Sequence, residues 1–355
     1  MFIITGSTGL IGSSCAEYFL SKNEKILGID NDFRSFFFGK TASNKWKEKK
    51  LKANKNYTHF KIDVRDKQKI FNLFKLNSKK IKVIIHTAAQ PSHDWAANNA
   101  HIDFHVNASG TLNLLEAFRN YCPEACFIFT STNKVYGDTP NQLPLIEKKF
   151  RYEIKKTHKY FLNGIDENMS IDNSTHSLFG VSKTSADLLV QEYGRYFNLN
   201  TVCFRGGCLT GENHSGAQLH GFLSFLVKTI INGKKYYIFG HKGKQVRDNI
   251  HSLDVVKAFE MYINKPLSGG KVYNLGGGRR NSCSILEAIN IIEKLSGKKS
   301  IYKILNTNRT GDHIWWISNN FKFKKDYPKW NIENNLEHSL KKMVEFNLKK
   351  KIKNF

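Results

Sequence analysis

Proline, cysteine and long apolar runs are all scarce in this chain. Its 355 residues include only 6 prolines, which excludes a proline-rich fibre. The 6 cysteines are scattered, which excludes a small disulfide scaffold, so we expect reduced thiols and no metal site. The longest apolar runs are strand-sized, far below the ~20 residues of a membrane-spanning helix. The first residues begin a strand directly, which predicts a cytoplasmic protein without a secretory leader or membrane partner.

Acidic residues are also few. The chain has 30 Asp and Glu against 55 Lys and Arg, which gives a net charge of +25. Such an excess is typical of proteins that bind nucleic acid, but no basic helix, RNP sequence or zinc-finger pattern accompanies it. We therefore predict no nucleic-acid partner. The lysine-rich stretches at 45–55 and 341–353 are expected to be solvated surface.

Apolar segments of strand length alternate with segments of helical spacing in the first part of the chain. This alternation predicts an α/β fold with a doubly wound parallel sheet and right-handed crossovers. The predicted strands are 2–5, 25–29, 60–63, 83–87, 125–130 and 201–205, and the predicted helices are 10–20, 67–74, 107–121 and 182–196.

The pattern changes beyond residue 205, where glycine-rich turns separate short elements. This change, in a chain whose length suits about two domains, predicts a second and smaller mixed α/β lobe. We predict a first domain of 1–205 plus 248–275 and a second lobe of 206–247 plus 276–355. The stretch 147–175 has weak periodicity and is expected to be a long inserted loop.

Three glycines, Gly6, Gly9 and Gly12, separate the first predicted strand from the first predicted helix. Their spacing allows a tight turn and a close approach of a pyrophosphate, whose charge the helix N-terminus attracts. Asp30 ends the second strand, where an acid can bind both hydroxyls of an adenosine ribose and repels a 2′-phosphate. The first domain is therefore predicted to be of the Rossmann type and to bind NAD. Arg34 lies close enough to complicate the choice of NAD over NADP.

Three further short sequences carry a family resemblance. They are Thr87-Ala88-Ala89, Ser131-Thr132-Asn133-Lys134-Val135-Tyr136-Gly137 and Gln245-Val246-Arg247-Asp248. With the glycine loop they resemble the extended short-chain dehydrogenase/reductase family of nucleotide-sugar epimerases and dehydratases. The resemblance covers the chain from residue 2 to about 330, and within the family it is greatest to the branch that acts on CDP-sugars at carbon 2.

The resemblance implies a cofactor, a substrate class and an activity. The implied reaction is NAD-dependent epimerisation of a nucleotide-diphosphate sugar through a transient keto-sugar, in a homo-oligomer. The second lobe would bind the nucleotide sugar, because two forked guanidinium groups suit a diphosphate. The implied NAD contacts are Gly6, Thr8, Gly9, Leu10, Ile11, Gly12, Asp30, Asn31, Asp63, Val64, Ala88, Ala89, Gln90, Asn107 and Lys183. The expected substrate contacts are Asn133, Cys208, His220, Arg247, Arg309 and Asp312.

The reaction centre departs from the family pattern at one position. Thr132 matches the family hydroxyl that bonds the reacting sugar oxygen, but the Tyr-x-x-x-Lys pair falls on Phe179 and Lys183. A phenol beside a lysine can accept the sugar's proton, whereas a phenyl ring cannot. Another group could supply the base: Asp94, His93 or Lys183 itself. Of the two loop residues we favour Asp94, because a carboxylate is ionised at neutral pH.

Two other accounts of this substitution stay open at the level of the sequence. In one, the protein binds NAD and a sugar nucleotide without turning the sugar over. In the other, the hydride chemistry differs from simple epimerisation, as in a nucleotide-sugar dehydratase. We favour a replaced base over both, because an otherwise complete reaction centre argues against lost chemistry.

Overall fold

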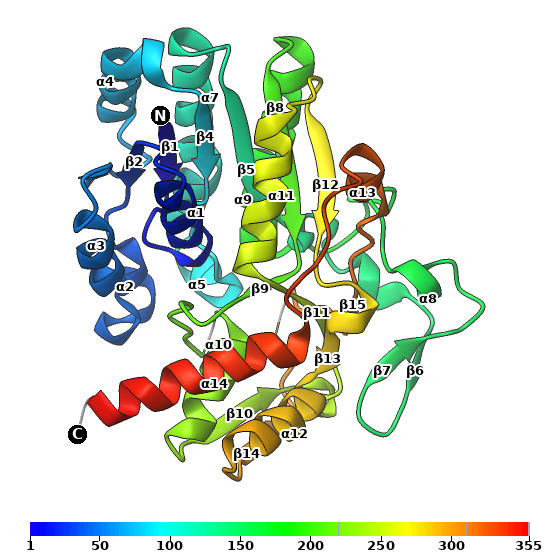
Figure 1. Ribbon diagram of the computed structural model, residues 1–355. Coiled ribbons are helices and arrows are strands. Elements are labelled where there is room, and N and C mark those ends of the chain that lie inside the picture. Colours follow the sequence, from blue (N-terminus) through cyan, green and yellow to red (C-terminus); the bar gives the residue numbers. More distant parts are fainter. Residues whose placement is uncertain (219, 310, 354–355) are drawn as a thin grey trace. The chain divides into compact units, whose positions relative to one another are not determined.

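A seven-stranded sheet forms the centre of the N-terminal part of the chain (Figure 1). The computed structural model describes residues 1–218, 220–309 and 311–353. In order across the sheet, the strands are β12 (Lys271–Leu275), β8 (Asn200–Gly206), β5 (Cys126–Thr132), β4 (Val83–His86), β1 (Phe2–Thr5), β2 (Ile26–Ile29) and β3 (Tyr57–Phe60). Strand β1 pairs in parallel with both β2 and β4. The strand order reverses there, so the predicted doubly wound α/β fold is confirmed.

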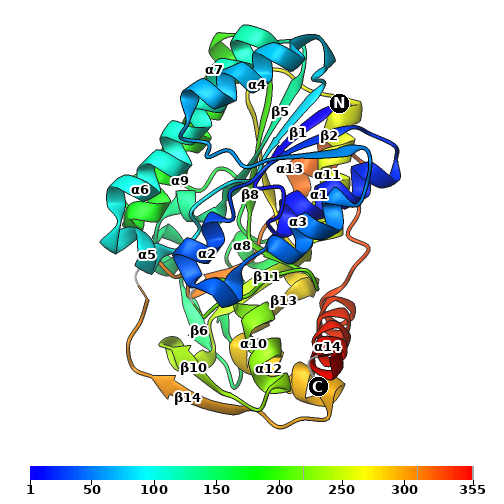
Figure 2. The same cartoon turned by 90° about the vertical axis from the view of Figure 1, so that its left-hand side faces the viewer.

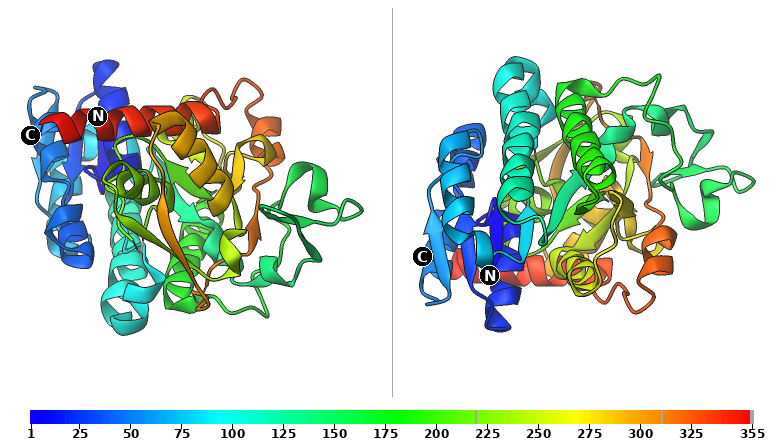
Figure 3. Two further views of the ribbon diagram at one scale, coloured as in Figure 1. Left: turned by 90° about the horizontal axis from the view of Figure 1, so that it is seen from below. Right: turned by 90° about the horizontal axis from the view of Figure 1, so that it is seen from above.

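Helices cover both faces of this sheet (Figure 2). One face carries α1 (Leu10–Ser21), α3 (Lys45–Lys52) and α11 (Ser252–Asn264), and the other carries α4 (Lys67–Asn77), α7 (Gly110–Tyr121) and α9 (Ser177–Tyr196). Seen from above, α7 and α9 lie side by side (Figure 3). Three short helices lie in the connections: α2 (Phe33–Phe38), α5 (His93–Asn98) and α6 (Ala100–Phe104).

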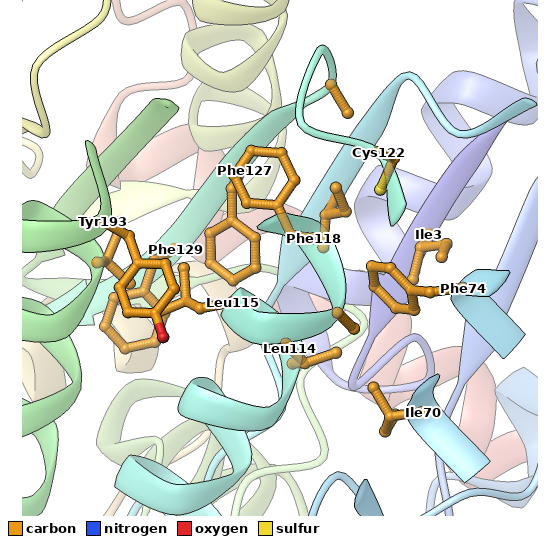
Figure 4. Close-up of a cluster of buried hydrophobic side chains, with 14 of the residues drawn as sticks. Ile3, Ile70, Phe74, Leu114, Leu115, Phe118, Cys122, Phe127, Phe129 and Tyr193 are labelled. Atoms are coloured by element: carbon orange, nitrogen blue, oxygen red, sulfur yellow. The ribbon is translucent and has the colours of Figure 1, made fainter. Parts of the chain in front are cut away.

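The core between α7 and the sheet follows from helical spacing. Leu114, Leu115 and Phe118 recur every three to four residues and are fully buried. They pack with Phe127 and Phe129 of β5 in one cluster (Figure 4). Burying each such side chain contributes roughly 1.5–3 kcal/mol. This packing holds β5, whose carboxyl end carries Thr132, in a rigid layer.

A buried ion pair fixes α9 on the sheet. Arg205 of β8 donates to the carboxylate of Asp187 of α9 at 2.8 Å, and their side chains are 7% and 0% exposed. Ser131 of β5 donates to the same carboxylate at 2.5 Å and Gln191 at 2.6 Å. Asp187 is thus fully hydrogen-bonded, which a buried charge requires. These contacts fix the position of α9 relative to the carboxyl end of β5.

The remaining segments form a second compact unit. Its strands are β6 (Leu145–Glu147), β7 (Tyr152–Ile154), β9 (Cys208–Thr210), β10 (Lys235–Phe239), β11 (Val246–His251), β13 (Ser282–Ser284), β14 (Ile301–Leu305) and β15 (Trp315–Trp316). Its helices are α8 (Tyr160–Asn163), α10 (Phe222–Ile231), α12 (Ile285–Ser296), α13 (Phe321–Asp326) and α14 (Leu336–Lys353). Strand β10 pairs in parallel with β14, and β11 lies between β13 and β15.

The lysine-rich stretch 341–353, which we expected to be solvated surface, lies in a helix with one buried face. Residues 341–353 belong to helix α14, which presents Leu340, Met343 and Val344 to a core shared with α10 and α12. These apolar residues recur at i, i+3 and i+4, so one face of the helix is buried, while Lys341 and Lys349 are exposed. Among the described residues, no helix is both long and apolar enough to cross a membrane.

The unit boundaries differ from the predicted domain boundaries. Unit 1 comprises Met1–Val135, His176–Arg205 and Val255–Tyr273, and unit 2 comprises Tyr136–Thr175, Gly206–Asp254 and the chain from Asn274 onward. Residues 136–175 therefore go with the second unit. Their contacts explain this, since Ile165 pairs with Ser318 and Glu153 accepts a bond from Trp315 at 3.0 Å.

The ion pair between Arg205 and Asp187 leads to a first prediction. Replacing the arginine in Arg205→Met leaves the Asp187 carboxylate buried without its charge partner, which should lower the free energy of unfolding by roughly 3–5 kcal/mol. Lys69→Met is the control, because the Lys69–Asp66 pair is largely exposed and should contribute little. Urea unfolding followed by circular dichroism measures both. Equal stability of the two variants would contradict the anchoring role.

Candidate functional site

The glycine loop between β1 and α1 leaves no room for larger residues at two of its three glycines. Gly6 has a φ of +64°, and a Cβ there would lie 2.7 Å from the backbone nitrogen of Ala88. A Cβ on Gly12 would lie 2.1 Å from the carbonyl oxygen of Gly6. Gly9 is different: its Cβ would meet only that same oxygen, at 3.1 Å. A side chain at position 9 would therefore still allow the loop to form, but it would fill the space above the loop.

The N-terminus of α1 fits the pyrophosphate of a dinucleotide. Its N-cap is Gly9, and no side chain caps the first turn. The N–H groups of that turn, together with the helix dipole, favour an anion. At the end of β2, Asp30 accepts bonds from the Thr8 backbone at 2.9 Å and hydroxyl at 2.7 Å, and from Asp32 N–H at 2.8 Å. The acid is thus held beside the loop, where a ribose would lie.

The other predicted cofactor residues lie in the connections that follow the strands. Asn31 donates to Asp63 at 3.0 Å, so the ends of β2 and β3 are joined. Asn107 lies in a π-helical turn (His105–Ser109) and bonds both the N–H and the carbonyl of Gln90, at 2.9 and 3.0 Å. This bond pair fixes the loop after β4, which contains Ala88. Leu10, Ile11 and Val64 flank the glycine loop and the end of β3.

Lys47 of α3 contradicts the expectation that residues 45–55 are solvated surface. It is 1% exposed, and its Nζ has no hydrogen-bond partner among the described residues. Burial and, to a lesser degree, the charge of Arg34 lower the pKa of Lys47 to about 7, while Glu17 and Asp30 oppose the shift. Sequence reasoning missed this residue because the lysines around it hide the helical periodicity.

Lys183 is buried beside the end of β5. Its Nζ donates to the carbonyl oxygen of Thr130 at 2.9 Å and lies 4.0 Å from the ring centre of Phe129. Burial lowers the pKa of this lysine to about 8, against the charge of Asp187. Phe179 lies one helical turn before it, on the same face of α9, and is 6% exposed. The structure thus brings the two together.

A histidine lies against the Phe179 ring and is hydrogen-bonded to a serine. The His93 ring meets it edge-on, with centres 5.0 Å apart at 77°. Nδ1 of His93 lies 2.6 Å from the hydroxyl oxygen of Ser177. Ser177 was not among the predicted site residues, although it stands only two positions before Phe179. Asp94, the other predicted base, occupies the first turn of α5 and is half-buried.

The end of β5 carries the predicted hydroxyl group. Thr132 Oγ1 accepts a bond from Lys134 N–H at 3.2 Å and donates to Asn133 Oδ1 at 3.4 Å. Both bonds are weak by their length, so this hydroxyl is available to a ligand at little cost. Thr132 is half-buried and Asn133 buried, at the carboxyl end of a strand where ligands of such sheets bind.

Unit 2 brings together part of the predicted substrate set. Arg247 of β11 forms an ion pair with Asp312 at 3.2 Å and is largely buried. His241 lies close to both: burial lowers its pKa, and the charge of Arg247 lowers it further. The guanidinium of Arg309 lies 6.0 Å from the ring of Phe239. His241 escaped sequence reasoning because no motif marked it.

Cys208 and His220 have other surroundings. Cys208 belongs to β9 and is half-buried, facing Asn249 in the register with β11. The ring of His220 lies 5.4 Å from that of His214. None of the six cysteines forms a disulfide.

A strand–glycine loop–helix cradle, an acid at the end of the next strand and a buried lysine on α9 define a dinucleotide-binding α/β protein. The family model described as "NAD dependent epimerase/dehydratase family" matches residues 2–276, and the chain belongs to this family. NAD, the predicted cofactor, is thereby confirmed, and so is the prediction of an NAD-dependent enzyme of the epimerase and dehydratase family. Both epimerases and dehydratases belong to the family, so the exact reaction is a separate question.

Individual relatives are similar over most of their length. The chain is 32% identical to CDP-paratose 2-epimerase from Salmonella typhi, over 82% of this chain and 83% of that one. It is 27% identical to UDP-glucuronate 4-epimerase from Thermodesulfobacterium geofontis, over 97% and 95%. UDP-glucuronic acid 4-epimerase from Bacillus cereus, solved with UDP-glucuronic acid and NAD, has a TM-score of 0.79 at 22% identity, covering 98% and 99%. The predicted homo-oligomer and the roles of single residues stay predictions.

The space above the glycine loop can be tested by filling it. Gly9→Val should abolish NAD binding, because the side chain occupies the path of the pyrophosphate while the loop itself can close. Isothermal titration calorimetry measures binding, and circular dichroism checks that the variant is folded. A folded Gly9→Val protein that binds NAD as tightly as the parent would show that the cofactor lies elsewhere.

The buried ammonium of Lys47 predicts a pH dependence of stability. Its pKa is about 7 in the folded chain and about 10.4 when unfolded. Between these values the unfolded chain binds more protons, so this lysine makes stability rise with pH, by up to about 1.4 kcal/mol per unit.

Lys47→Met should remove that contribution. We expect the variant to be more stable than the parent at pH 6–7, with the difference shrinking toward pH 10. Lys49→Met changes an exposed lysine of the same helix and should leave the pH profile as it is. Urea unfolding across this range tests the sign, and a constant difference between Lys47→Met and the parent would refute it.

Proposed function

We propose that the protein epimerises a CDP-hexose at carbon 2. The observation that carries this proposal is the 32% identity to a CDP-paratose 2-epimerase over four-fifths of both chains, against 27% to a UDP-glucuronate 4-epimerase. NAD⁺, when bound, supplies the hydride acceptor and later the donor, so the sugar passes through a ketone with no net oxidation.

The residues of unit 1 would bind and orient the cofactor. The first turn of α1 would bind the pyrophosphate, and Asp30 the hydroxyls of the adenosine ribose. Lys183, whose ammonium already has a fixed acceptor in Thr130, would orient the nicotinamide ribose. Thr132, at the end of β5, would donate its hydroxyl to the sugar oxygen as that oxygen becomes a carbonyl.

The residues of unit 2 would bind the nucleotide. Arg247 and Arg309 are the proposed diphosphate contacts, because a guanidinium binds phosphate oxygens in pairs. Arg247 also pairs with Asp312 at 3.2 Å. Asp312 is the proposed contact to the nucleoside ribose, and Cys208 and His220 are proposed to line the sugar.

The geometry changes which residue we prefer as the proton acceptor. Phe179 cannot titrate, and the ring that packs against it belongs to His93. A general base must lie within hydrogen-bond reach of the reacting hydroxyl before its pKa matters. We therefore propose His93 rather than Asp94 as the base in this part of the site.

A second candidate function is favoured by one observation, the phenyl ring at position 179. Without a replacement base the protein would bind NAD and a sugar nucleotide and convert neither. Incubating the protein and NAD⁺ with a panel of CDP- and UDP-hexoses, and following the sugar by proton NMR, separates the two. Formation of the carbon-2 epimer from a CDP-sugar supports the enzyme, and an unchanged panel supports the binding protein.

The proposed contact between Arg247 and the diphosphate can be tested directly. Arg247→Lys keeps the charge but loses the paired N–H groups, so CDP binding should weaken about 10-fold or more while NAD binding stays unchanged. Arg280→Lys, at an exposed position of the same unit, is the matched control. Calorimetry with CDP and with NAD separates the effects. Equal weakening of both ligands would mean that Arg247 acts through the fold instead.

A further inference from the structure

We propose that Ser177 and His93 together replace the missing phenol. In this relay, the Ser177 hydroxyl takes the proton of the reacting sugar hydroxyl while its own proton passes to the ring of His93. The proposal rests on the proposed function, and it names a catalytic residue, Ser177, that lies outside the Tyr-x-x-x-Lys pair.

Two hydrogen bonds hold the hydroxyl oxygen of Ser177 in place. Its Oγ lies 2.6 Å from Nδ1 of His93 and accepts a bond from Gly180 N–H at 3.3 Å. The relay requires the Ser177 hydroxyl to donate to the histidine, and the oxygen then keeps a lone pair for the proton of the sugar. A neutral His93 with its proton on Nε2 presents a lone pair at Nδ1 to receive the serine proton. The arrangement is that of a hydroxyl activated by an adjacent base.

The backbone at Ser177 supports a functional reading. Its φ is +59°, a left-handed conformation that residues other than glycine rarely adopt. Such a conformation costs about 1–3 kcal/mol and persists only where its surroundings enforce it. Here it occurs at the first residue of the 20-residue helix α9. Gly180 N–H and the positive end of that helix would stabilise negative charge that develops on the serine oxygen.

The pair also lies next to the position that a phenol would occupy. The His93 ring contacts the ring of Phe179, and Phe179 shares a face of α9 with Lys183. The phenyl ring therefore forms an apolar wall beside the pair. A wall of this kind limits access of water to a base whose proton must return to the same sugar.

The protons balance over one catalytic cycle. In the first half, the sugar O–H bond breaks and a Ser177 O–H bond forms, as the former Ser177 O–H bond breaks and an N–H bond forms on His93. The histidine becomes an imidazolium, and a bound NAD⁺ would accept the C–H hydrogen as hydride. The second half runs these proton transfers backwards to the carbonyl oxygen as the hydride returns. Neither protons nor electrons are exchanged with solvent.

Ser177→Ala and His93→Gln test the relay. Each should slow single-turnover oxidation of the CDP-sugar about 10²- to 10⁴-fold, with NAD and CDP affinities unchanged. Adding Phe179→Tyr to Ser177→Ala should restore part of the rate, because it supplies the phenol that the serine replaces. A merely structural role of Ser177 would not allow this rescue. Ser185→Ala, at a half-buried position of α9, and His101→Gln, at an exposed position, are the matched controls and should keep the parent rate.

A titration of the free protein adds a readout that needs neither ligand. In proton–nitrogen NMR spectra, Ser177→Ala should raise the pKa of His93, because the hydroxyl that stabilises its neutral form is lost. An unchanged His93 titration, or a Ser177→Ala enzyme at the parent rate, overturns the relay alone. A parent protein that leaves every sugar of the panel unchanged overturns the proposed function, and the relay with it.

Discussion

The attachment of α9 to the sheet is the constraint on which the candidate reaction centre depends. Arg205 and Ser131 bond the carboxylate of Asp187 from two different strands, so the helix can neither slide nor rotate without breaking a buried ion pair. Lys183, one turn earlier, is thereby held against the end of β5. The helical repeat then places Phe179 on the same face, with Ser177 at the helix start. A single buried charge positions three residues proposed to act on cofactor and sugar.

The electrostatic surroundings of Phe179 suit a histidine base better than a phenol. A phenol works as a base only when a nearby cation lowers its pKa. Here burial lowers the pKa of Lys183 to about 8, and its ammonium is bonded to a backbone carbonyl. This lysine is suited to holding a ribose hydroxyl rather than to activating a neighbour. A histidine needs no such cation, because its ordinary pKa already lies near neutrality.

The features predictable from the sequence are those set by short-range pattern. Alternating segments predicted the parallel sheet, and the glycine spacing predicted the cradle at α1, because both depend on residues close together in the chain. Lys47, Ser177 and His241 depend on contacts between distant segments. The predicted helix at 182–196 began too late to include Ser177, because the structure starts α9 there from a left-handed backbone that no local preference favours. The placement of 136–175 likewise follows from pairing with residues near 318.

The central claim is that one hydrogen leaves carbon 2 of a CDP-hexose and returns to the same carbon. It is tested most directly with CDP-paratose carrying deuterium at carbon 2, incubated with the protein and NAD⁺ in ordinary water. The account predicts a carbon-2 epimer that retains the deuterium at that carbon, because a bound NAD⁺ would accept this deuterium and return it to the same carbon. An epimer that has exchanged its deuterium for solvent hydrogen would contradict the account.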